Sequence, residues 1–412
     1  MSNLTNETWW TRMRRSLFGD TERLERGEQS MPFVSVSTPS GGAVNADTAL
    51  KLATVWACVR LRSQTISSLP LHLRDNDKNI ADQHPLYRIL HDAPNADMTS
   101  SEFFEAMIAS LDLWGNAYSL ISRNKAGAVV SLEVLNPEKM SVSRSKSGEI
   151  SYKYEGKHER TEFHEDEILH IKGFTLDGLV GLSPIKYQSS TMGMQIDANN
   201  AASQEFKNNL KVGGFLKTGE RTLNDEQRAR LRANLTTFGQ PENAGKWMVL
   251  ESGMEPASAA NIRINPQDAQ LLESRYFGIE EICRAFGVPP QLIYHTDKAS
   301  SWASSLEQMN LGFLTYSLRP VLVRIEQTIA RKLLTPAERL KYKPKYSVEG
   351  LLRADSQGRA NFYSQMLQNG VMTRNEVRGL EDLPPHDGAD DLTVQLNLTP
   401  IHKLGNENDN QD

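Results

Sequence analysis

Three groups of residues have types and spacings that could perform chemistry, and the first is a glycine–lysine loop. Gly239, Gly245 and Lys246 resemble a loop that cradles a nucleotide phosphate. That motif needs four residues between its glycines and a Ser or Thr after the lysine. Here five residues separate the glycines and Trp247 follows the lysine. The segment is therefore typical of a polar loop between a helix and a strand, and no ATP site is expected.

The second group is a set of histidines, His158, His164 and His170, spaced by six residues with Glu165 beside the middle one. A zinc-binding helix needs histidines at i and i+4 on one face. On a strand, residues six apart share a side of the sheet but lie too far apart to share one metal ion. We expect satisfied surface or edge histidines and no metal site.

The third group, Asp387, Asp390 and Asp391, lacks the alternating carboxylates, central glycine and distal glutamate of a calcium loop. A solvated acidic loop is expected instead. No GxSxG sequence and no Cys–His arrangement indicates a nucleophile. We expect no enzyme activity and no cofactor.

Both cysteines, Cys58 and Cys283, fall in apolar helical patterns without a CxxC partner. Residues of this kind are typically reduced and buried, in a cytosolic protein.

Length and charge limit the remaining functions. The chain has 412 residues, enough for two to three domains. Lys and Arg number 46 and Asp and Glu 51, giving a net charge of −5. A protein that grips nucleic acid through its phosphates normally shows the opposite excess. No apolar run approaches the roughly 18 residues of a membrane span, and no signal peptide is indicated, so no membrane partner is expected.

The first half predicts an α+β domain. Apolar residues at helical spacing predict helices over 46–67 and 101–113. Apolar alternation predicts short strands, which cover 69–73, 118–121, 129–134, 140–142, 151–154 and 168–171.

Two long helices then bracket a small insert. Ser183 as a cap and Pro184 in the first turn predict one helix from there to about Asn208. Its apolar stripe is thin, so it needs partly polar neighbours on several sides. The return helix, 268–286, ends at Gly287. The insert predicts strands at 214–217, 246–251 and 257–264 and a helix over 224–238.

The ends of the chain are less regular. A helix is expected from Ser304 or Ser305 to Leu334, kinked by Pro320. The segment 350–380 is expected to be helical with Asp355 and Thr373 as caps, and beyond Pro385 the chain becomes acidic and then disordered. Residues 1–45 favour either a docking or membrane-surface helix or a loosely ordered arm that lies on a neighbour, with 31–45 as a linker.

Seven short motifs occur in one order along the chain, and together they resemble the HK97 type of tailed-phage portal protein. They are Val55–Val59 leading to Leu69–Leu71, His84–Tyr87 with Pro94–Asn95, Leu113–Tyr118, Gly178–Pro184, Phe286–Pro290, Glu307–Gln308 with Pro320, and Gly370–Arg378. Most of these residues have structural roles: Gly115–Asn116 permits a tight turn and Thr373 caps a helix. The motifs therefore mark a fold rather than a catalytic site.

The resemblance implies an α+β portal fold assembled as a ring, normally dodecameric, at the unique capsid vertex. It implies the following parts: a flexible N-terminal arm (1–45), a wing (46–183), a first stem helix (184–212), a clip (213–264), a second stem helix (265–289), a tunnel loop (290–304), a long kinked helix with a wing return (305–349), a crown (350–392) and a disordered tail (393–412).

The implied partners are further copies of the chain, the major capsid protein, the large terminase, the head–tail adaptor and duplex DNA bound without sequence specificity. The implied location is the virion, after assembly in the cytoplasm of the bacterial host. The acidic balance fits, since a neutral or negative wall lets DNA slide.

Candidate channel residues come from the implied tunnel loop and are His295, Lys298, Ser300, Ser301 and Trp302. Lys298, with His295 nearby, could reduce repulsion of DNA locally, or it is a solvated loop lysine. An exposed aromatic such as Trp302 in a polar loop usually packs against something. We expect Lys298 and Trp302 near the ring axis.

Two other functions remain open from the sequence. One is a DNA-processing enzyme of a packaging apparatus, which would show metal-dependent cleavage or ATP turnover. The other is a monomeric interaction scaffold, which would migrate as a single 46.2 kDa chain.

Overall fold

The computed structural model describes residues 30, 32–37, 42–156, 160–207, 216–218, 224–230, 254–256, 267–295, 308–348, 356–381 and 383–393. The chain divides into two compact units, Met1–Lys345 and Tyr346–Asp412. Among the described helices, none is long and apolar enough to cross a membrane.

The helical part of the first unit is built on two helices, Ala53–Ser67 (α3) and Ser100–Trp114 (α5), which pack against each other. Thr99 and Glu102 form a capping box at the start of α5, as its sequence predicts. The expected single helix over 46–67 is wrong: Ala46–Leu50 forms a separate helix (α2), because Leu52 adopts an extended conformation with ψ 120°. A shorter helix, Pro85–His91 (α4), packs on the strand Leu71–Arg74 (β3).

Two three-stranded antiparallel sheets lie beside these helices. In the first, Asn116–Arg123 (β4) is central between Val129–Leu135 (β5) and Ile168–Lys172 (β9). In the second, Ile150–Glu155 (β7) is central between Met140–Arg144 (β6) and Arg160–His164 (β8). A core of Tyr118, Met140, Val142, Tyr152 and Ile168 joins the two sheets. β8 was not predicted because its residues are mostly exposed and show no apolar alternation.

Smaller pairings complete this unit. Leu71–Arg74 (β3) pairs with Lys343–Tyr346 (β12), which returns from far along the chain. Val36–Ser37 (β1) pairs with Ala43–Val44 (β2). The linker expected over 31–45 is therefore wrong for this hairpin, in which Val44 is buried.

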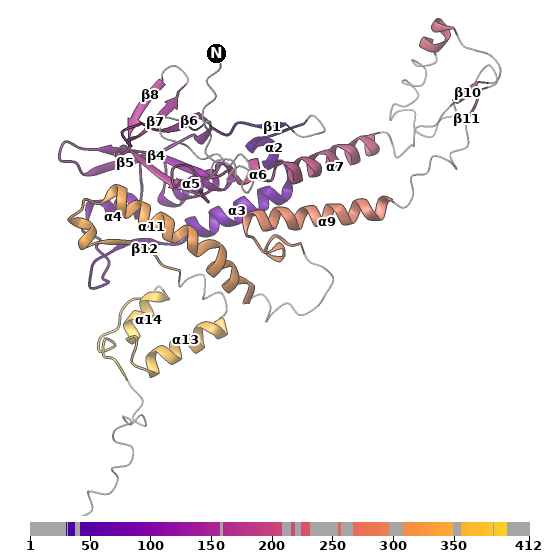
Figure 1. The fold of residues 1–412 in the computed structure, drawn as a ribbon. Coiled ribbons are helices and arrows are strands. Elements are labelled where there is room, and N and C mark those ends of the chain that lie inside the picture. Colours follow the sequence, from indigo (N-terminus) through magenta and orange to yellow (C-terminus); the bar gives the residue numbers. More distant parts are fainter. Residues whose placement is uncertain are drawn as a thin grey trace, which may run out of the picture. The chain divides into compact units, whose positions relative to one another are not determined.

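Two long helices leave the sheet region side by side (Figure 1). The chain enters through a short helix, Pro184–Tyr187 (α6), and continues as Ser189–Lys207 (α7); it returns as Gln267–Phe286 (α9). Ser183 caps α6 as expected, but the single helix predicted from Pro184 is interrupted, because Gln188 leaves the helical conformation (φ −105°, ψ 15°). α7 and α9 approach closely where a side chain at Gly278 would collide with Gln195.

The insert between the long helices is described in part. Leu216–Thr218 (β10) pairs antiparallel with Met254–Pro256 (β11), and residues 225–230 are helical after Asn224, whose side chain accepts from the Gln227 amide. The strands predicted at 246–251 and 257–264 lie outside the described residues.

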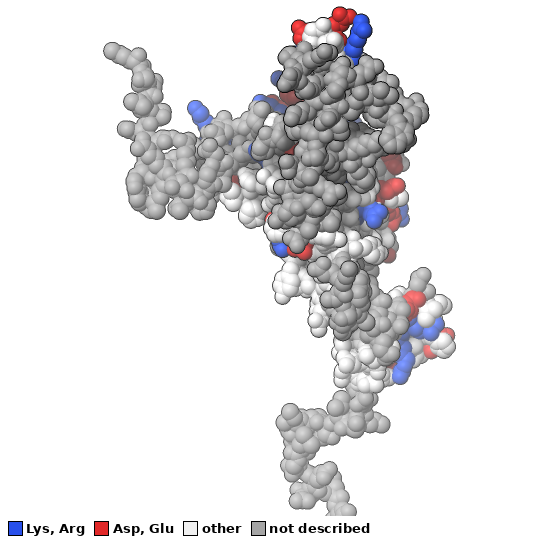
Figure 2. All heavy atoms as spheres, turned by 90° about the vertical axis from the view of Figure 1, so that its right-hand side faces the viewer, with Lys and Arg blue, Asp and Glu red and all other residues white. Residues whose placement is uncertain are grey.

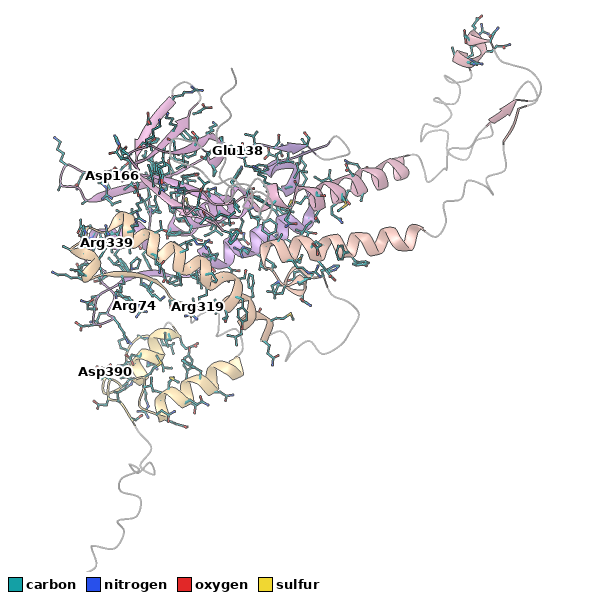
Figure 3. All side chains as sticks on the ribbon, in the orientation of Figure 1. Arg74, Glu138, Asp166, Arg319, Arg339 and Asp390 are labelled. Atoms are coloured by element: carbon teal, nitrogen blue, oxygen red, sulfur yellow. The ribbon has the colours of Figure 1, made fainter. Side chains whose placement is uncertain are left out.

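The helix expected to kink at Pro320 has a different form. Residues 308–312 are α-helical, Phe313–Leu318 (η5) is π-helical, and Arg319–Leu333 (α11) resumes the α-helix with Pro320 in its first turn. This wider π-helical turn lies just before Pro320, which has no backbone N–H to donate in a hydrogen bond. α11 packs on β9, and Figure 3 shows Arg319 at its start and Arg339 beyond its end.

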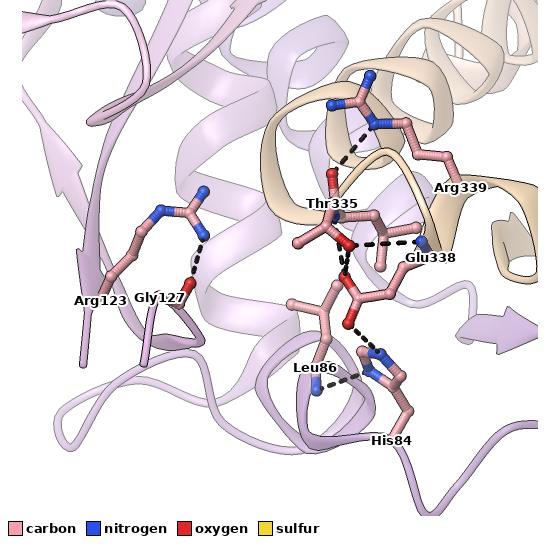
Figure 4. Close-up of polar contacts among 8 residues, drawn as sticks. His84, Leu86, Arg123, Gly127, Thr335, Glu338 and Arg339 are labelled. Carbon is pink, nitrogen blue, oxygen red and sulfur yellow. Dashed lines mark hydrogen bonds and ion pairs between the residues drawn. The ribbon is translucent and has the colours of Figure 1, made fainter. Parts of the chain in front are cut away.

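The segment after α11 is held to the helical part by side chains (Figure 4). Glu338, at the start of the turn Glu338–Leu340 (η6), accepts hydrogen bonds from the amide and hydroxyl of Thr335. Its other carboxylate oxygen lies 3.4 Å from Nε2 of His84, whose Nδ1 accepts from the Leu86 amide and caps α4. The Thr335 bonds are the main cause of a lowered pKa of Glu338.

The second unit contains two helices, Ser356–Gln368 (α13) and Arg374–Leu380 (α14). Thr373 and Glu376 form the predicted capping box; Asp355, the other expected cap, lies outside the described residues. Asn375 binds the loop after Pro385, because its amide nitrogen donates to the His386 carbonyl and to Asp390. Asp387, Asp390 and Asp391 are all exposed, as expected for a solvated loop, and Asp390 also accepts a hydrogen bond from Asn375.

The turn from α5 into β4 depends on Gly115. Its φ is +73°, which favours glycine. A Cβ at this position would lie 2.2 Å from the carbonyl oxygen of Leu182, on the segment that enters α6. The tight turn predicted at Gly115–Asn116 is confirmed, and it also lets two distant segments touch.

We predict that Gly115→Ala destabilises the protein more than Gly178→Ala does. Gly178 has nearly the same φ, +74°, but a Cβ there would meet nothing within 4 Å. Gly178→Ala should cost about 1–2 kcal/mol from backbone strain alone. Gly115→Ala adds the collision with Leu182 and should cost about 2–5 kcal/mol in total. Urea unfolding of the two variants measures the difference, and equal losses would contradict the close approach.

Candidate inter-subunit surface

The candidate channel residues follow the C-terminal end of α9. After Gly287 (φ +64°) and two prolines, Pro290–Ile293 (η4) forms a short 3₁₀ turn. His295 follows it: its amide donates to the Pro290 carbonyl, and its ring centroid lies 5.3 Å from that of Tyr276 on α9. His295 is thus fixed beside the long helix. Lys298, Ser300, Ser301 and Trp302 lie outside the described residues.

A buried arginine joins four segments at the base of α9. The Nε of Arg62 on α3 donates to the Asp112 carboxylate of α5 at 2.9 Å. Its Nη1 donates to the Phe286 carbonyl, the last residue of α9, at 2.9 Å and to the Ser317 hydroxyl of η5 at 2.7 Å. The two charged side chains are only 9% and 6% exposed. Arg62 therefore fixes α9 and η5 against the α3–α5 pair.

Asp112 shows the electrostatic cost of this arrangement. Burial raises the pKa of its carboxyl group, and the charge and hydrogen bond of Arg62 oppose that rise. A buried ion pair of this kind is stable only while both partners are present.

The base of the other long helix is held by a second buried network. The Asn116 carboxamide oxygen accepts from the Gly181 amide at 2.7 Å, and its nitrogen donates to the Gly181 carbonyl at 2.8 Å. The same oxygen lies 3.0 Å from Nε2 of His170, and Nδ1 of that ring lies 3.3 Å from the Tyr152 hydroxyl. Ser183 donates to the Leu113 carbonyl at 2.9 Å. The entry to α6 is thereby fixed to the end of α5.

The three histidines singled out in the sequence do not lie together in the structure as far as it describes them. His170 is buried in edge strand β9 with both ring nitrogens paired, His164 is exposed on β8, and His158 lies outside the described residues. Burial lowers the pKa of His170 well below its usual value, so the ring is neutral. No described group of three His, Cys, Asp or Glu residues is arranged to hold a metal ion.

Cys58 on α3 and Cys283 on α9 are both buried, as predicted, and their thiols hydrogen-bond each other. The bond and burial raise the pKa of Cys58. This contact is part of the packing of α9 on α3.

Large apolar side chains are exposed along the long helices and their base. They are Trp56, Tyr187, Met194, Tyr276, Phe277, Tyr294, Leu311 and Tyr316. Single exposed apolar residues are ordinary, but this set follows connected elements, which is typical of an interaction surface. Apolar spacing in the sequence does not reveal this set, because it cannot distinguish an apolar residue that is buried from one, such as Tyr276, that is exposed.

Charge on the described residues is mixed. On the face in Figure 2, blue and red atoms of these residues are interspersed rather than gathered into one basic surface. This agrees with the net charge of −5. The described residues on this face show no basic patch of the kind that binds phosphates tightly.

Comparisons with known proteins identify what the chain is similar to. A family model described as phage portal protein matches residues 53–382. The portal protein of Enterobacteria phage HK97 is 37% identical over 410 residues, which cover 97% of this chain and 95% of the relative. A solved structure described as the neck of an empty GTA particle computed with C6 symmetry is 25% identical, with a TM-score of 0.60 over 88% of this chain and 97% of that one. The neck of a native GTA particle computed with C12 symmetry is 24% identical, with a TM-score of 0.56 over 85% and 96%.

We predict that Arg62→Leu destabilises the protein by about 3–5 kcal/mol, because it leaves the Asp112 charge buried and unpaired. Without the arginine the pKa of Asp112 rises further. A raised folded-state pKa means that stability is lost as pH rises, so the loss should be greater at pH 8 than at pH 5. Denaturant unfolding at the two pH values measures both effects.

The matched control is Arg62→Leu combined with Asp112→Leu, which removes both charges and should recover most of the loss. A double variant as unstable as the single one would contradict an ion-pair role for these residues.

We also predict that His170 makes the fold sensitive to acid. Its folded-state pKa lies below the unfolded value of about 6.5, so the unfolded chain binds more protons and stability falls as pH drops below that value. His170→Gln should flatten the pH dependence between pH 6.5 and 5, whereas His164→Gln on the exposed strand should leave it unchanged. Thermal unfolding against pH tests this, and an equal slope in His170→Gln would refute it.

Proposed function

Because this chain belongs to the phage portal protein family, we propose that its copies close into a dodecameric ring at the capsid vertex and that DNA enters and leaves the particle through the ring. Members of this family are structural proteins of the virion rather than enzymes, and the portal vertex is where this chain acts. The subunit number is supported by the twelvefold symmetry of one similar neck structure.

The main observation that supports a ring is the way the long helices are packed. α7 and α9 pack against each other, and α9 also packs on α3, yet Phe277, Tyr276 and Met194 are all more than half exposed. In a ring with cyclic symmetry, each copy presents one face to the copy on one side and a different face to the copy on the other. Contacts of that kind cover the exposed apolar side chains on both sides of each copy.

Charge supports passage of DNA rather than its capture. Duplex DNA carries one negative charge about every 1.7 Å, and a basic channel would bind it and slow translocation. The net negative charge of this chain does not favour strong binding of DNA. We assign local reduction of repulsion to the loop after η4, with Lys298 and Trp302 near the ring axis and His295 at its base.

The remaining parts are assigned by their place in the chain. We propose that 46–183 with the return 305–349 is the wing, which meets the major capsid protein, and that 184–212 and 265–289 are the stem. The insert 213–264 is the clip, where the large terminase and later the head–tail adaptor dock. Residues 350–392 form the crown, which corresponds to the second compact unit from Tyr346 onward.

We predict that the purified chain forms rings with a central hole, visible by negative-stain electron microscopy, with native mass spectrometry giving the copy number. The packing of α7 and α9 requires neighbours, so the ring should persist at moderate salt. Particles with the mass of one 46.2 kDa chain in every salt condition would favour the monomeric scaffold instead. Metal-dependent DNA cleavage or ATP turnover would favour the processing enzyme.

A further inference from the structure

An open groove runs along the outer face of α3. Its floor is made by Ala53, Ala57 and Leu61, which share one helix face, and one wall is Ile279 of α9. The other wall is Leu292 and Ile293 of η4. The groove has a volume of about 680 Å³, which is larger than the volume of a single aromatic side chain.

Tyr294 lines the groove in an unusual backbone conformation. Its φ is +62°, in the left-handed region that residues other than glycine rarely adopt, and the residue is 90% exposed. Strain of this kind persists where surrounding structure imposes it and is concentrated at functional sites. An almost uncovered tyrosine beside an apolar floor indicates a surface that another molecule covers.

The opposite side of α9 carries a projecting aromatic residue. Phe277 is 60% exposed, and the guanidinium of Arg284, about two turns further along the same helix face, lies 5.9 Å from its ring centroid. Arg284 in turn pairs with Glu280 and Glu281. These contacts restrict the side chains around Phe277 before any partner binds.

Helix geometry separates Phe277 from the groove of its own copy. Residues 277 and 279 are two positions apart, so their side chains point roughly 160° apart around α9. Ile279 lines the groove, and Phe277 therefore faces away from it. One copy thus carries an exposed phenylalanine on one face of α9 and, on the opposite face, a recess whose apolar floor is bordered by polar residues such as Gln64 and Ser68. A projection and a recess on opposite faces are the arrangement that a ring of identical copies requires.

We propose that Phe277 of one copy inserts into the groove between α3 and η4 of the next copy. This inference rests on the ring proposed above and names the contact that closes it. Arg60, on the rim of the groove, has no ion-pair partner among the described residues. The side chains around Phe277 are the carboxylates of Glu280 and Glu281 and the guanidinium of Arg284 that pairs with them, which together carry one net negative charge. That net charge is opposite in sign to Arg60, and the partner is a second copy of this chain.

The test is cross-linking of Phe277→Cys/Leu61→Cys with a short bismaleimide, followed by a denaturing gel. The contact joins position 277 of each copy to position 61 of the next, so we expect a ladder of covalent multimers that extends to the full ring. Each single variant should stay monomeric on the gel, and so should the wild type, because Cys58 and Cys283 are buried. The control Val130→Cys/Leu61→Cys uses a residue of β5 that is 55% exposed and should give no ladder.

A second measurement follows assembly itself. Phe277→Ala should raise the protein concentration at which rings fall apart by at least about tenfold, because a buried phenyl ring is lost at every contact. Val130→Ala, with a similar exposed fraction, should leave that concentration unchanged. Intact rings of the double-cysteine variant without a ladder would overturn this contact and leave the ring standing. Absence of rings in the wild type would instead overturn the proposed function.

Discussion

The buried pair of Arg62 and Asp112 is the interaction on which the rest of the first unit depends. It is made by residues fifty positions apart, and the same guanidinium then binds the last carbonyl of α9 and a hydroxyl of η5. A planar group with five fixed donors can bind several acceptors at once, which a lysine cannot do in the same geometry. Arg62 therefore fixes the C-terminal end of α9 to three other elements, alongside the packing of α9 on α3 and α7.

The two long helices are fixed to the same end of α5. α9 is fixed through Arg62 to Asp112, and α6 is fixed through Ser183 to Leu113 and through Gly181 to Asn116. The approach of Leu182 to Gly115 requires that no Cβ lie between them. Since α7 follows α6, the bases of α7 and α9 are fixed at one place, and the two helices then pack directly against each other where Gly278 meets Gln195. Rigid placement of these helices is needed in a ring, because every copy repeats the same geometry and an error in helix angle would be repeated in each of them.

Sequence reasoning predicted the features that depend on neighbouring residues. The cap at Ser183, the capping boxes at Thr99 and Thr373, the end of α9 at Gly287 and the turn at Gly115 each rest on local chemistry and were found where expected. The helix breaks at Leu52 and Gln188, the π turn before Pro320 and strand β8 were missed, because packing against distant segments decides them. The Arg62 network was missed for the same reason: nothing near Arg62 in the sequence indicates Asp112 or Ser317. The channel residues stay a prediction, since among them only His295 is described. The exposed apolar surface of α9 and α3 could be recognised only from exposure in three dimensions.

Charge explains why apolar contacts must hold such a ring together. Every copy carries the same net charge of −5, so neighbouring copies repel each other, and the repulsion accumulates around a closed ring. Dissolved salt screens this repulsion over about 8–10 Å, but it leaves the burial of aromatic surface almost unchanged. Salt should therefore favour association between copies, whereas it weakens any contact between protein and phosphate. Attraction between copies therefore has to come from apolar contacts, and exposed aromatic residues such as Phe277 and Tyr294 are the side chains on this chain that can provide it.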